Sequence, residues 1–177
     1  CVKFLIKKIY KESPHLATVS YFIASHIKTW MKNPKITLTP NVVDTNLFFP
    51  VPNRNTIFTF IHVSTLIPLK NVKGILNAFN SLYGNRAFDY IQLIIIGNKD
   101  DTYLEFAKSI GISHKVIFKG EISYAEVAKE MKNCHCLIIN SIMENAPCVI
   151  SEAHCCGLPV IATKVGGIPE MIDQENG

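Results

Sequence analysis

Short runs rich in β-branched residues alternate with helix-period segments along the whole chain. Segments of this kind build βαβ units, in which a helix returns the chain to the next strand of a parallel sheet. The continuous apolar run YIQLIIIG (90–97) fits a strand that is buried on both faces, as in such a sheet. The sequence therefore predicts an α/β fold with a Rossmann-like, doubly wound parallel sheet.

A proline-rich stretch divides this pattern into two series of elements. Pro40, Pro50 and Pro52 lie in PNVVDTNLFFPVPNRNT, where they fix φ and remove donors that a sheet would need. We therefore expect a remnant of one domain at 1–40, an interdomain linker at 41–55 and a second domain at 56–177. The expected strands are 16–20, 35–39, 56–65, 90–97, 116–120, 136–140 and 160–167, and the expected helices are 21–32, 70–83, 102–110, 124–133 and one from Pro147 to Gly157.

Charge and hydropathy exclude two classes of function. Eighteen basic and fourteen acidic residues leave a net charge of +4, and they are scattered rather than gathered on one segment, so nucleic acid is not an expected partner. No apolar run reaches the ~18–20 residues that span a bilayer. The opening segment 1–12 reads as a basic amphipathic helix, which fits peripheral contact with a membrane or, alternatively, a solvated face of a packed helix.

The six cysteines favour core positions in a reducing cytoplasm. Five of them lie in the last third of the chain within apolar text, where small buried side chains belong. Cys134-His135-Cys136 lacks the two-residue spacing with which a pair of thiolates closes on zinc. We expect no metal site and no bound cofactor.

Candidate ligand-binding residues follow the strands, because doubly wound sheets bind ligands at the carboxyl ends of their strands. After the strand at 56–65 come Thr65 and Lys70, whose ammonium at a helix start could meet a phosphate or simply be solvated. After the strand at 90–97 comes Gly97, which fits a nucleotide edge and equally a plain turn. The pair Gly166 and Gly167 lets backbone approach a ligand closely.

Two carboxylates flank the helix that Pro147 opens. Glu144 lies in the preceding loop, and Glu152 lies ~7–8 Å along the helix at ~1.5 Å per residue. Backbone N–H groups at such a helix start can hold a diphosphate, while a carboxylate beside it can bind sugar or ribose hydroxyls. The alternative is a solvated loop acid and an ordinary helix-surface acid. Together, the four places describe a pocket for a sugar nucleotide.

Several segments resemble a known family in the correct order. ENAPCVISEAHCCGLPVIATKVGGIPEMI resembles the E-x7-E signature of the retaining glycosyltransferases of family 4, also called glycosyl transferases group 1. TPNVVDTNLFFP resembles their interdomain segment, and HVSTLIPLKN their first donor-domain strand and phosphate loop. The resemblance covers about residues 17–177 and implies the donor-binding half of a GT-B fold.

The resemblance also implies roles for individual residues. Lys70 matches the lysine at the donor diphosphate, Glu144 the glutamate near the donor sugar, and Glu152 the one that binds the ribose. Asn145, Ala146, Pro147 and Cys148 would offer backbone N–H groups to sugar and phosphate. Thr65 stands where the family usually has an arginine, which predicts weaker donor affinity or a cation from elsewhere.

The implied activity is metal-independent, retaining transfer of a sugar from a UDP- or GDP-linked donor to a hydroxyl of a carbohydrate or lipid-linked acceptor. The alternatives are a non-catalytic nucleotide-sugar-binding subunit, which the missing arginine favours, and a nucleotide-sugar epimerase on the same fold. Because the chain begins at Cys1 and ends in loop-like text, we expect it to be a segment of a longer protein. Alone, it is predicted to show no transfer activity.

Overall fold

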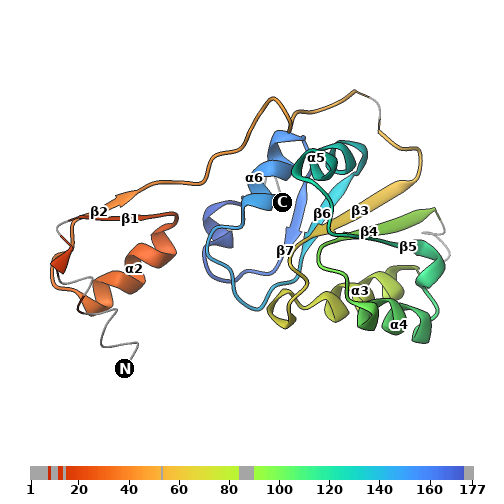
Figure 1. The fold of residues 1–177 in the computed structure, drawn as a ribbon, viewed down its shortest axis with the longest axis horizontal. Coiled ribbons are helices and arrows are strands. Elements are labelled where there is room, and N and C mark those ends of the chain that lie inside the picture. Colours follow the sequence, from red (N-terminus) through yellow and green to blue (C-terminus); the bar gives the residue numbers. More distant parts are fainter. Residues whose placement is uncertain (1–7, 9–11, 14, 53, 84–89, 174–177) are drawn as a thin grey trace.

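The computed structural model describes residues 8, 12, 13, 15–52, 54–83 and 90–173. A smaller part formed by residues 15–40 lies beside a larger part built on a sheet (Figure 1). The basic helix predicted over 1–12 falls outside the described residues except at Lys8 and Glu12. No helix among the described residues combines the length and the apolarity that a membrane crossing requires.

The smaller part is one βαβ unit. Its strands β1 (Leu16–Thr18) and β2 (Ile36–Leu38) pair in parallel, and α2 (Tyr21–Trp30) connects them. Ser20 caps the helix, because its side-chain oxygen accepts a hydrogen bond from the N–H of Ile23. Only Ala24 and Ile27 of α2 are buried, so this unit has a thin core of its own.

The larger part contains a five-stranded parallel sheet in the order β5-β4-β3-β6-β7. Its first half runs outward from β3 to β5, and its second half runs outward from β3 to β7, which is the doubly wound arrangement. The predicted α/β class is confirmed. The strands are β3 (Phe58–Val63), β4 (Ile91–Ile96), β5 (Val116–Gly120), β6 (Cys136–Ile139) and β7 (Val160–Ala162).

Helices cover both faces of this sheet (Figure 1). One face carries α3 and α4, and the other carries α5 and α6; each face forms a separate buried cluster. Ser123 and Glu126 form the predicted capping box at the start of α5. The helices are α3 (Val72–Tyr83), α4 (Asp101–Ser109), α5 (Tyr124–Asn133) and α6 (Cys148–Cys155), with short 3₁₀ turns η1 (Pro68–Lys70), η3 (Ser113–Lys115) and η4 (Ile168–Glu170).

The connecting segment packs onto the larger part. It forms no helix or strand over 41–52, yet Phe48 is buried in the core cluster beneath α5 and α6. Arg54 donates hydrogen bonds to the carbonyls of Cys156 and Gly157, at 2.9 and 2.8 Å, and so caps the carboxyl end of α6. The segment is therefore anchored to the larger part by a buried ring and a helix cap.

Most element boundaries differ from the predicted ones by a few residues, and three of these differences have a clear local cause. Lys70 is the last residue of η1 and does not begin a helix, because Asn71 adopts a left-handed conformation (φ +50°) that separates η1 from α3. Pro147 is the N-cap of α6, so the helix begins one residue later, at Cys148. The last strand stops at Ala162, because Val165 donates its N–H to the Thr163 carbonyl and Gly166 then turns the chain at φ +57°.

Candidate active site

A pocket of about 240 Å³ opens where β3 and β6 end. The carboxyl edge of the sheet faces the side on which the smaller part lies (Figure 1). Five of the predicted site residues line this pocket, namely Thr65, Lys70, Glu144, Pro147 and Cys148. The other lining residues are His62, Val63, Ser64, Ile139, Ser141 and Val149.

Lys70 and Glu144 form an ion pair in this pocket. The Lys70 Nζ lies 2.6 Å from the Glu144 Oε1, and their side chains are 21% and 10% exposed. The Ser141 hydroxyl donates a second hydrogen bond to the same carboxylate oxygen at 2.7 Å. A largely buried cation and anion with few solvent contacts interact strongly, so the pair fixes both side chains at the pocket floor.

Backbone contacts hold the two loops that carry this pair. The N–H of Ile142 donates to the carbonyl of Leu69 at 2.8 Å, which joins the loop after β6 to the loop after β3. A Cβ atom on Gly166 would lie 1.6 Å from the carbonyl oxygen of Glu144, and one on Gly167 would lie 1.8 Å from that of Asn145. The lack of side chains at the glycine pair thus leaves room for the backbone of the Glu144 loop, whereas the sequence predicted that it leaves room for a ligand.

His62 is a site residue that sequence analysis missed. It is buried on β3 beneath the ion pair, and its Nδ1 lies 2.9 Å from the carbonyl of Ile138. A carbonyl can only accept, so Nδ1 carries the proton and Nε2 accepts from the Ser64 hydroxyl at 2.8 Å. Ser64 in turn accepts from the N–H of Leu66, which has φ +54°. This relay stabilises a left-handed turn in the loop after β3.

Burial sets the charge state of His62. It lowers the pKa of the imidazole to about 4, and the nearby Lys70 ammonium adds to the lowering. The ring is therefore neutral at neutral pH, and Lys70 is the cation among the described residues that line the pocket. A signal for His62 was present in the sequence, since a histidine interrupts the otherwise apolar run FIHV (60–63).

Glu152 lies apart from Glu144, one turn into α6. The residue is buried, and its Oε1 accepts a hydrogen bond from the Tyr124 hydroxyl at 3.1 Å. Burial raises the pKa of the Glu152 carboxyl above its ordinary value. The sequence-based alternative of an ordinary helix-surface acid is therefore wrong for Glu152, and Tyr124 is a neighbour that sequence analysis missed.

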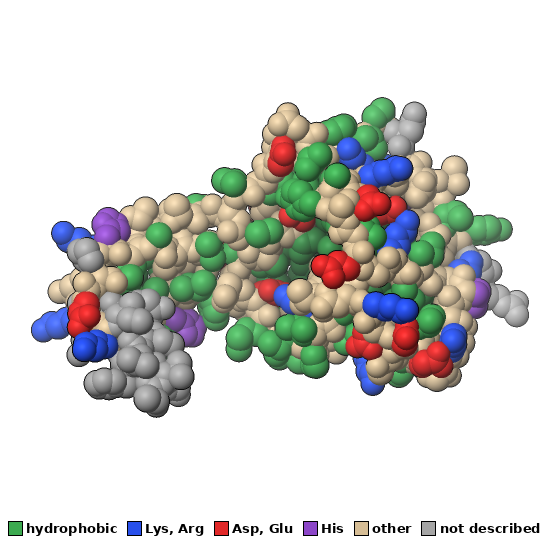
Figure 2. Space-filling model, in the orientation of Figure 1, with side chains coloured by type: hydrophobic (Ala, Val, Ile, Leu, Met, Phe, Trp, Pro, Cys, Tyr) green, Lys and Arg blue, Asp and Glu red, His purple; other side chains and the backbone are tan. Residues whose placement is uncertain are grey.

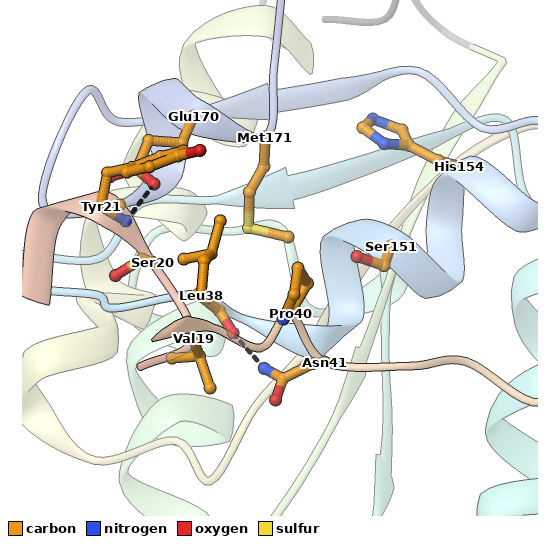
Figure 3. A pocket seen from close by; sticks show the side chains of 12 residues that line it. Val19, Ser20, Tyr21, Leu38, Pro40, Asn41, Ser151, His154, Glu170 and Met171 are labelled. Atoms are coloured by element: carbon orange, nitrogen blue, oxygen red, sulfur yellow. Dashed lines mark hydrogen bonds between the residues drawn. The ribbon is translucent and has the colours of Figure 1, made fainter. Parts of the chain in front are cut away.

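Besides Glu152 and the glycine pair, three predicted residues lie outside this pocket. Gly97 lines a separate cavity of about 280 Å³ at the ends of β4 and β5, and a Cβ there would lie 1.9 Å from the Ser64 carbonyl oxygen. Asn145 is exposed on the loop before α6. Ala146 lines a third cavity, of about 460 Å³, between the smaller and larger parts (Figure 3). The predicted residues that line a cavity are thus distributed over three cavities rather than gathered in one.

Four exposed apolar side chains belong to the loops after β3 and β6. Figure 2 shows hydrophobic side chains gathered along the lower edge of the larger part, over these two loops. The exposed members are Ile67, Leu69, Ile142 and Met143. The ion pair therefore lies beside an apolar rim.

The cysteines only partly follow the expectation of core positions. Cys134, Cys136 and Cys156 are buried free thiols, and Cys155 is half-buried. Cys148 is exposed, so the expectation is wrong there, because the start of α6 faces the pocket rather than the core. Among the described residues, no three His, Cys, Asp or Glu side chains cluster in a way that could hold a metal ion.

Comparison with known proteins places this geometry in a family context. The family model described as "Glycosyl transferases group 1" matches residues 43–177. The N-acetyl-alpha-D-glucosaminyl L-malate synthase of Bacillus anthracis is 31% identical over 114 residues, which are 63% of this chain and 29% of that protein. The MMP alpha-(1->4)-mannosyltransferase of Mycolicibacterium hassiacum is 29% identical over 168 residues, 94% of this chain and 41% of that protein.

A solved structure shows the same fold at lower identity. A mutant of S. aureus TarM, solved in complex with Fondaparinux, alpha-GlcNAc-glycerol and UDP, superposes with a TM-score of 0.83 at 15% identity. The match covers 99% of this chain and 35% of the TarM chain. This chain thus spans less than half the length of each of these three proteins.

Proposed function

The chain belongs to the glycosyl transferases group 1 family, and on that premise we propose that it is the donor-binding part of a retaining, metal-independent glycosyltransferase. The observation that carries this proposal is the Lys70–Glu144 ion pair beside the start of α6. The donor would be a UDP- or GDP-linked sugar, and the acceptor a carbohydrate or lipid-linked hydroxyl compound. The TarM structure contains UDP, which supports a nucleoside diphosphate at this site.

Lys70 and the start of α6 form the proposed diphosphate site. The first N–H groups of a helix have no partner within it, and the helix dipole favours an anion there. Cys148 and Val149 supply two of these N–H groups at the pocket wall. As the glycosidic bond breaks, its electron pair moves onto the leaving diphosphate, and these groups stabilise the added charge.

Glu144 would serve the donor sugar. A diphosphate at Lys70 competes for the ammonium that Glu144 now holds, which frees carboxylate lone pairs for sugar hydroxyl groups. The sugar becomes oxocarbenium-like, and the acceptor oxygen attacks C1 from the face that the diphosphate leaves. The acceptor's proton passes to a departing phosphate oxygen, so the anomeric configuration is retained and the step needs no metal.

Glu152 and Tyr124 would bind the ribose. A buried carboxylate with one hydroxyl partner has unused acceptor capacity, and a vicinal diol offers two donors to it. Glu152 lies one turn into α6, whose first N–H groups belong to the proposed diphosphate site, and Tyr124 contacts its carboxylate from the start of α5. The assignment predicts that loss of the Glu152 charge weakens binding of UDP and GDP together.

The proposal is tested by nucleotide binding to this chain. Thermal unfolding is measured with UDP, GDP, UDP-GlcNAc and GDP-mannose, with and without EDTA, since only a ligand that binds the folded state raises the melting temperature. We expect one nucleoside diphosphate to stabilise the chain in the presence of EDTA. Absence of stabilisation by all four, at millimolar concentration, would argue against the proposal.

A second candidate is a non-catalytic nucleotide-sugar-binding subunit, and Thr65 favours it. Thr65 is exposed at the pocket, where an arginine would have added a second cation to Lys70. In the whole protein, Glu144→Gln separates the two candidates. Transfer activity that falls with this substitution supports the enzyme, whereas unchanged activity of the protein's pathway supports the binding subunit.

A further inference from the structure

Glu170 connects the two parts of the molecule. It is the last residue of η4, and its carboxylate accepts hydrogen bonds from the backbone N–H groups of Tyr21 and Phe22 at 2.7 and 2.6 Å. Figure 3 shows this carboxylate over the start of α2, on the rim of the cavity between the parts. Because each oxygen binds one of two consecutive N–H groups, the carboxylate fixes both the position and the direction of α2.

The start of α2 needs this carboxylate. The first N–H groups of a helix lack partners within it, and Ser20 supplies an acceptor only for Ile23. The first turn of α2 contains no acidic residue, although a negative charge is favourable at that end of a helix. Glu170, which follows Phe22 by 148 residues in the sequence, supplies the two acceptors and also the negative charge.

The segment that ends in Glu170 also holds the Glu144 loop. Gly166 and Gly167 pack directly against the carbonyl oxygens of Glu144 and Asn145, and the Gly167 N–H donates to the Glu144 carbonyl at 3.3 Å. A second bridge lies close by, since the Asn41 side chain donates to the Ala146 carbonyl at 2.9 Å. Residues 166–170 therefore contact α2 at one end and the backbone of Glu144 at the other.

We infer that Glu170 is a positioning residue for the proposed donor site. Its hydrogen bonds to α2 hold residues 166–170 in place, and the contacts of the glycine pair with the Glu144 loop in turn hold Glu144 against Lys70. Glu170 contacts no proposed substrate group. The inference rests on the proposed function for its effect on donor binding.

The first test measures amide hydrogen exchange by NMR. Glu170→Gln keeps the size of the side chain and removes its charge, so exchange at Tyr21 and Phe22 is expected to become roughly tenfold faster. Ser20→Ala is the matched variant, because it should speed exchange at Ile23 and leave the Glu170 contacts in place. Glu121→Gln, at an exposed glutamate after β5, should change none of the three amides. Unchanged exchange at Tyr21 and Phe22 in Glu170→Gln would overturn the inference.

The second test separates positioning from simple capping of α2. Glu170→Gln should shift the amide resonances of Glu144 and Asn145 and weaken binding of UDP or GDP, whichever the unaltered chain binds, by roughly tenfold in calorimetry. Ser20→Ala should do neither. Faster exchange at Tyr21 and Phe22 without a change in affinity or in the Glu144 and Asn145 amides would refute the positioning role.

These readouts also separate the inference from the proposed function. If the unaltered chain binds neither UDP nor GDP, the proposed donor site fails, and the amide shifts of Glu144 and Asn145 still decide whether Glu170 positions that loop. If the unaltered chain binds a nucleotide and Glu170→Gln binds it equally well, the proposed function stands and the inference is wrong.

Discussion

Glu144 and Glu152 are separated by seven residues, but their carboxylates have opposite surroundings. Glu144 lies in a loop before α6 and receives hydrogen bonds from a lysine and a serine on other elements. Glu152 lies within α6, buried, with the Tyr124 hydroxyl as its partner. The first carboxylate is therefore held by its neighbours, and the second is held by the geometry of its own helix.

Because of this difference, Glu144 and Glu152 should be sensitive to different kinds of change. The position of Glu144 depends on glycines, on the relay through His62 and on the Lys70 charge, so it is sensitive to changes in packing and in protonation. Glu152 keeps its position on α6 whatever happens to those groups. Changes at Glu152 should instead act through desolvation of its charge and through its capacity to accept hydrogen bonds.

The largest effect is expected from Gly166→Ala, which disturbs the packing around Glu144. The new Cβ would lie 1.6 Å from the Glu144 carbonyl oxygen, and the residue has φ +57°. We expect a loss of about 3–5 kcal/mol in the free energy of unfolding, measured by urea denaturation. Gly111→Ala is the matched control, since Gly111 has φ +80° and open space around it, and should lose only about 1 kcal/mol. Equal losses in the two variants would contradict the close packing.

The next effect concerns pH and the histidine beneath Glu144. The pKa of His62 falls from 6.5 to about 4 on folding, so between these values the unfolded chain binds the proton and the folded chain does not. The stability that His62 contributes is thus complete above pH 6.5 and is lost as the pH falls toward 4. At 1.36 kcal/mol per pKa unit, the loss is about 3 kcal/mol.

This pH dependence is measured against variants at the same position. Urea unfolding of the unaltered chain between pH 7.5 and 4 should show a steeper decline than that of His62→Gln, which has no proton to gain. His62→Asn serves as a second variant, because its amide can still donate to the Ile138 carbonyl. Parallel curves for all three chains would show that His62 is not the buried neutral group described above.

Removal of the Lys70 ammonium tests the charge that holds Glu144. Lys70→Ala leaves Glu144 without its cation and removes the proposed partner of the diphosphate, so nucleotide affinity should fall by about 2 kcal/mol, or roughly thirtyfold. The exposed Lys73, which lies over the Phe106 ring, provides the control Lys73→Ala. Calorimetric titration with UDP or GDP should leave Lys73→Ala within a factor of two of the unaltered chain.

Local signals in the sequence predicted the elements well, because they act within a few residues. The capping box of Ser123 and Glu126 starts α5 as expected, and the alternation of strands and helices predicted the parallel sheet. The approach of Lys70 to Glu144 was also foreseeable, since both follow strands whose carboxyl ends share one edge. These inferences needed only spacing and topology.

Contacts between distant segments could not be predicted in the same way. The burial of Phe48 under α6 and the reach of Glu170 to α2 depend on how separate elements dock, which no local pattern records. Asn71 adopts the left-handed conformation more readily than most residues do, but no local pattern placed that conformation between Lys70 and α3. The sequence therefore predicted some residues of the pocket, such as Lys70 and Glu144, but neither His62 nor the contacts that hold these side chains in place.

The smallest effect is expected at Glu152, where a substitution can remove a single buried charge. Burial raises the pKa of this carboxyl, so the folded state favours the protonated form. Stability therefore falls as the pH rises from the ordinary pKa of 4.5 toward the folded pKa, and the loss is complete above the folded pKa. Glu152→Gln removes that penalty and should raise the free energy of unfolding by about 1 kcal/mol at pH 7.5 relative to the unaltered chain, with the difference disappearing near pH 4. Glu126→Gln, at a glutamate whose pKa is lowered by the Ser123 hydrogen bonds, should have the opposite sign, because its ionised form stabilises the fold. If Glu152→Gln were destabilising at pH 7.5, the Tyr124 hydrogen bond would outweigh the desolvation of the carboxylate, and Glu152 would resemble Glu144 as a group held by its partner.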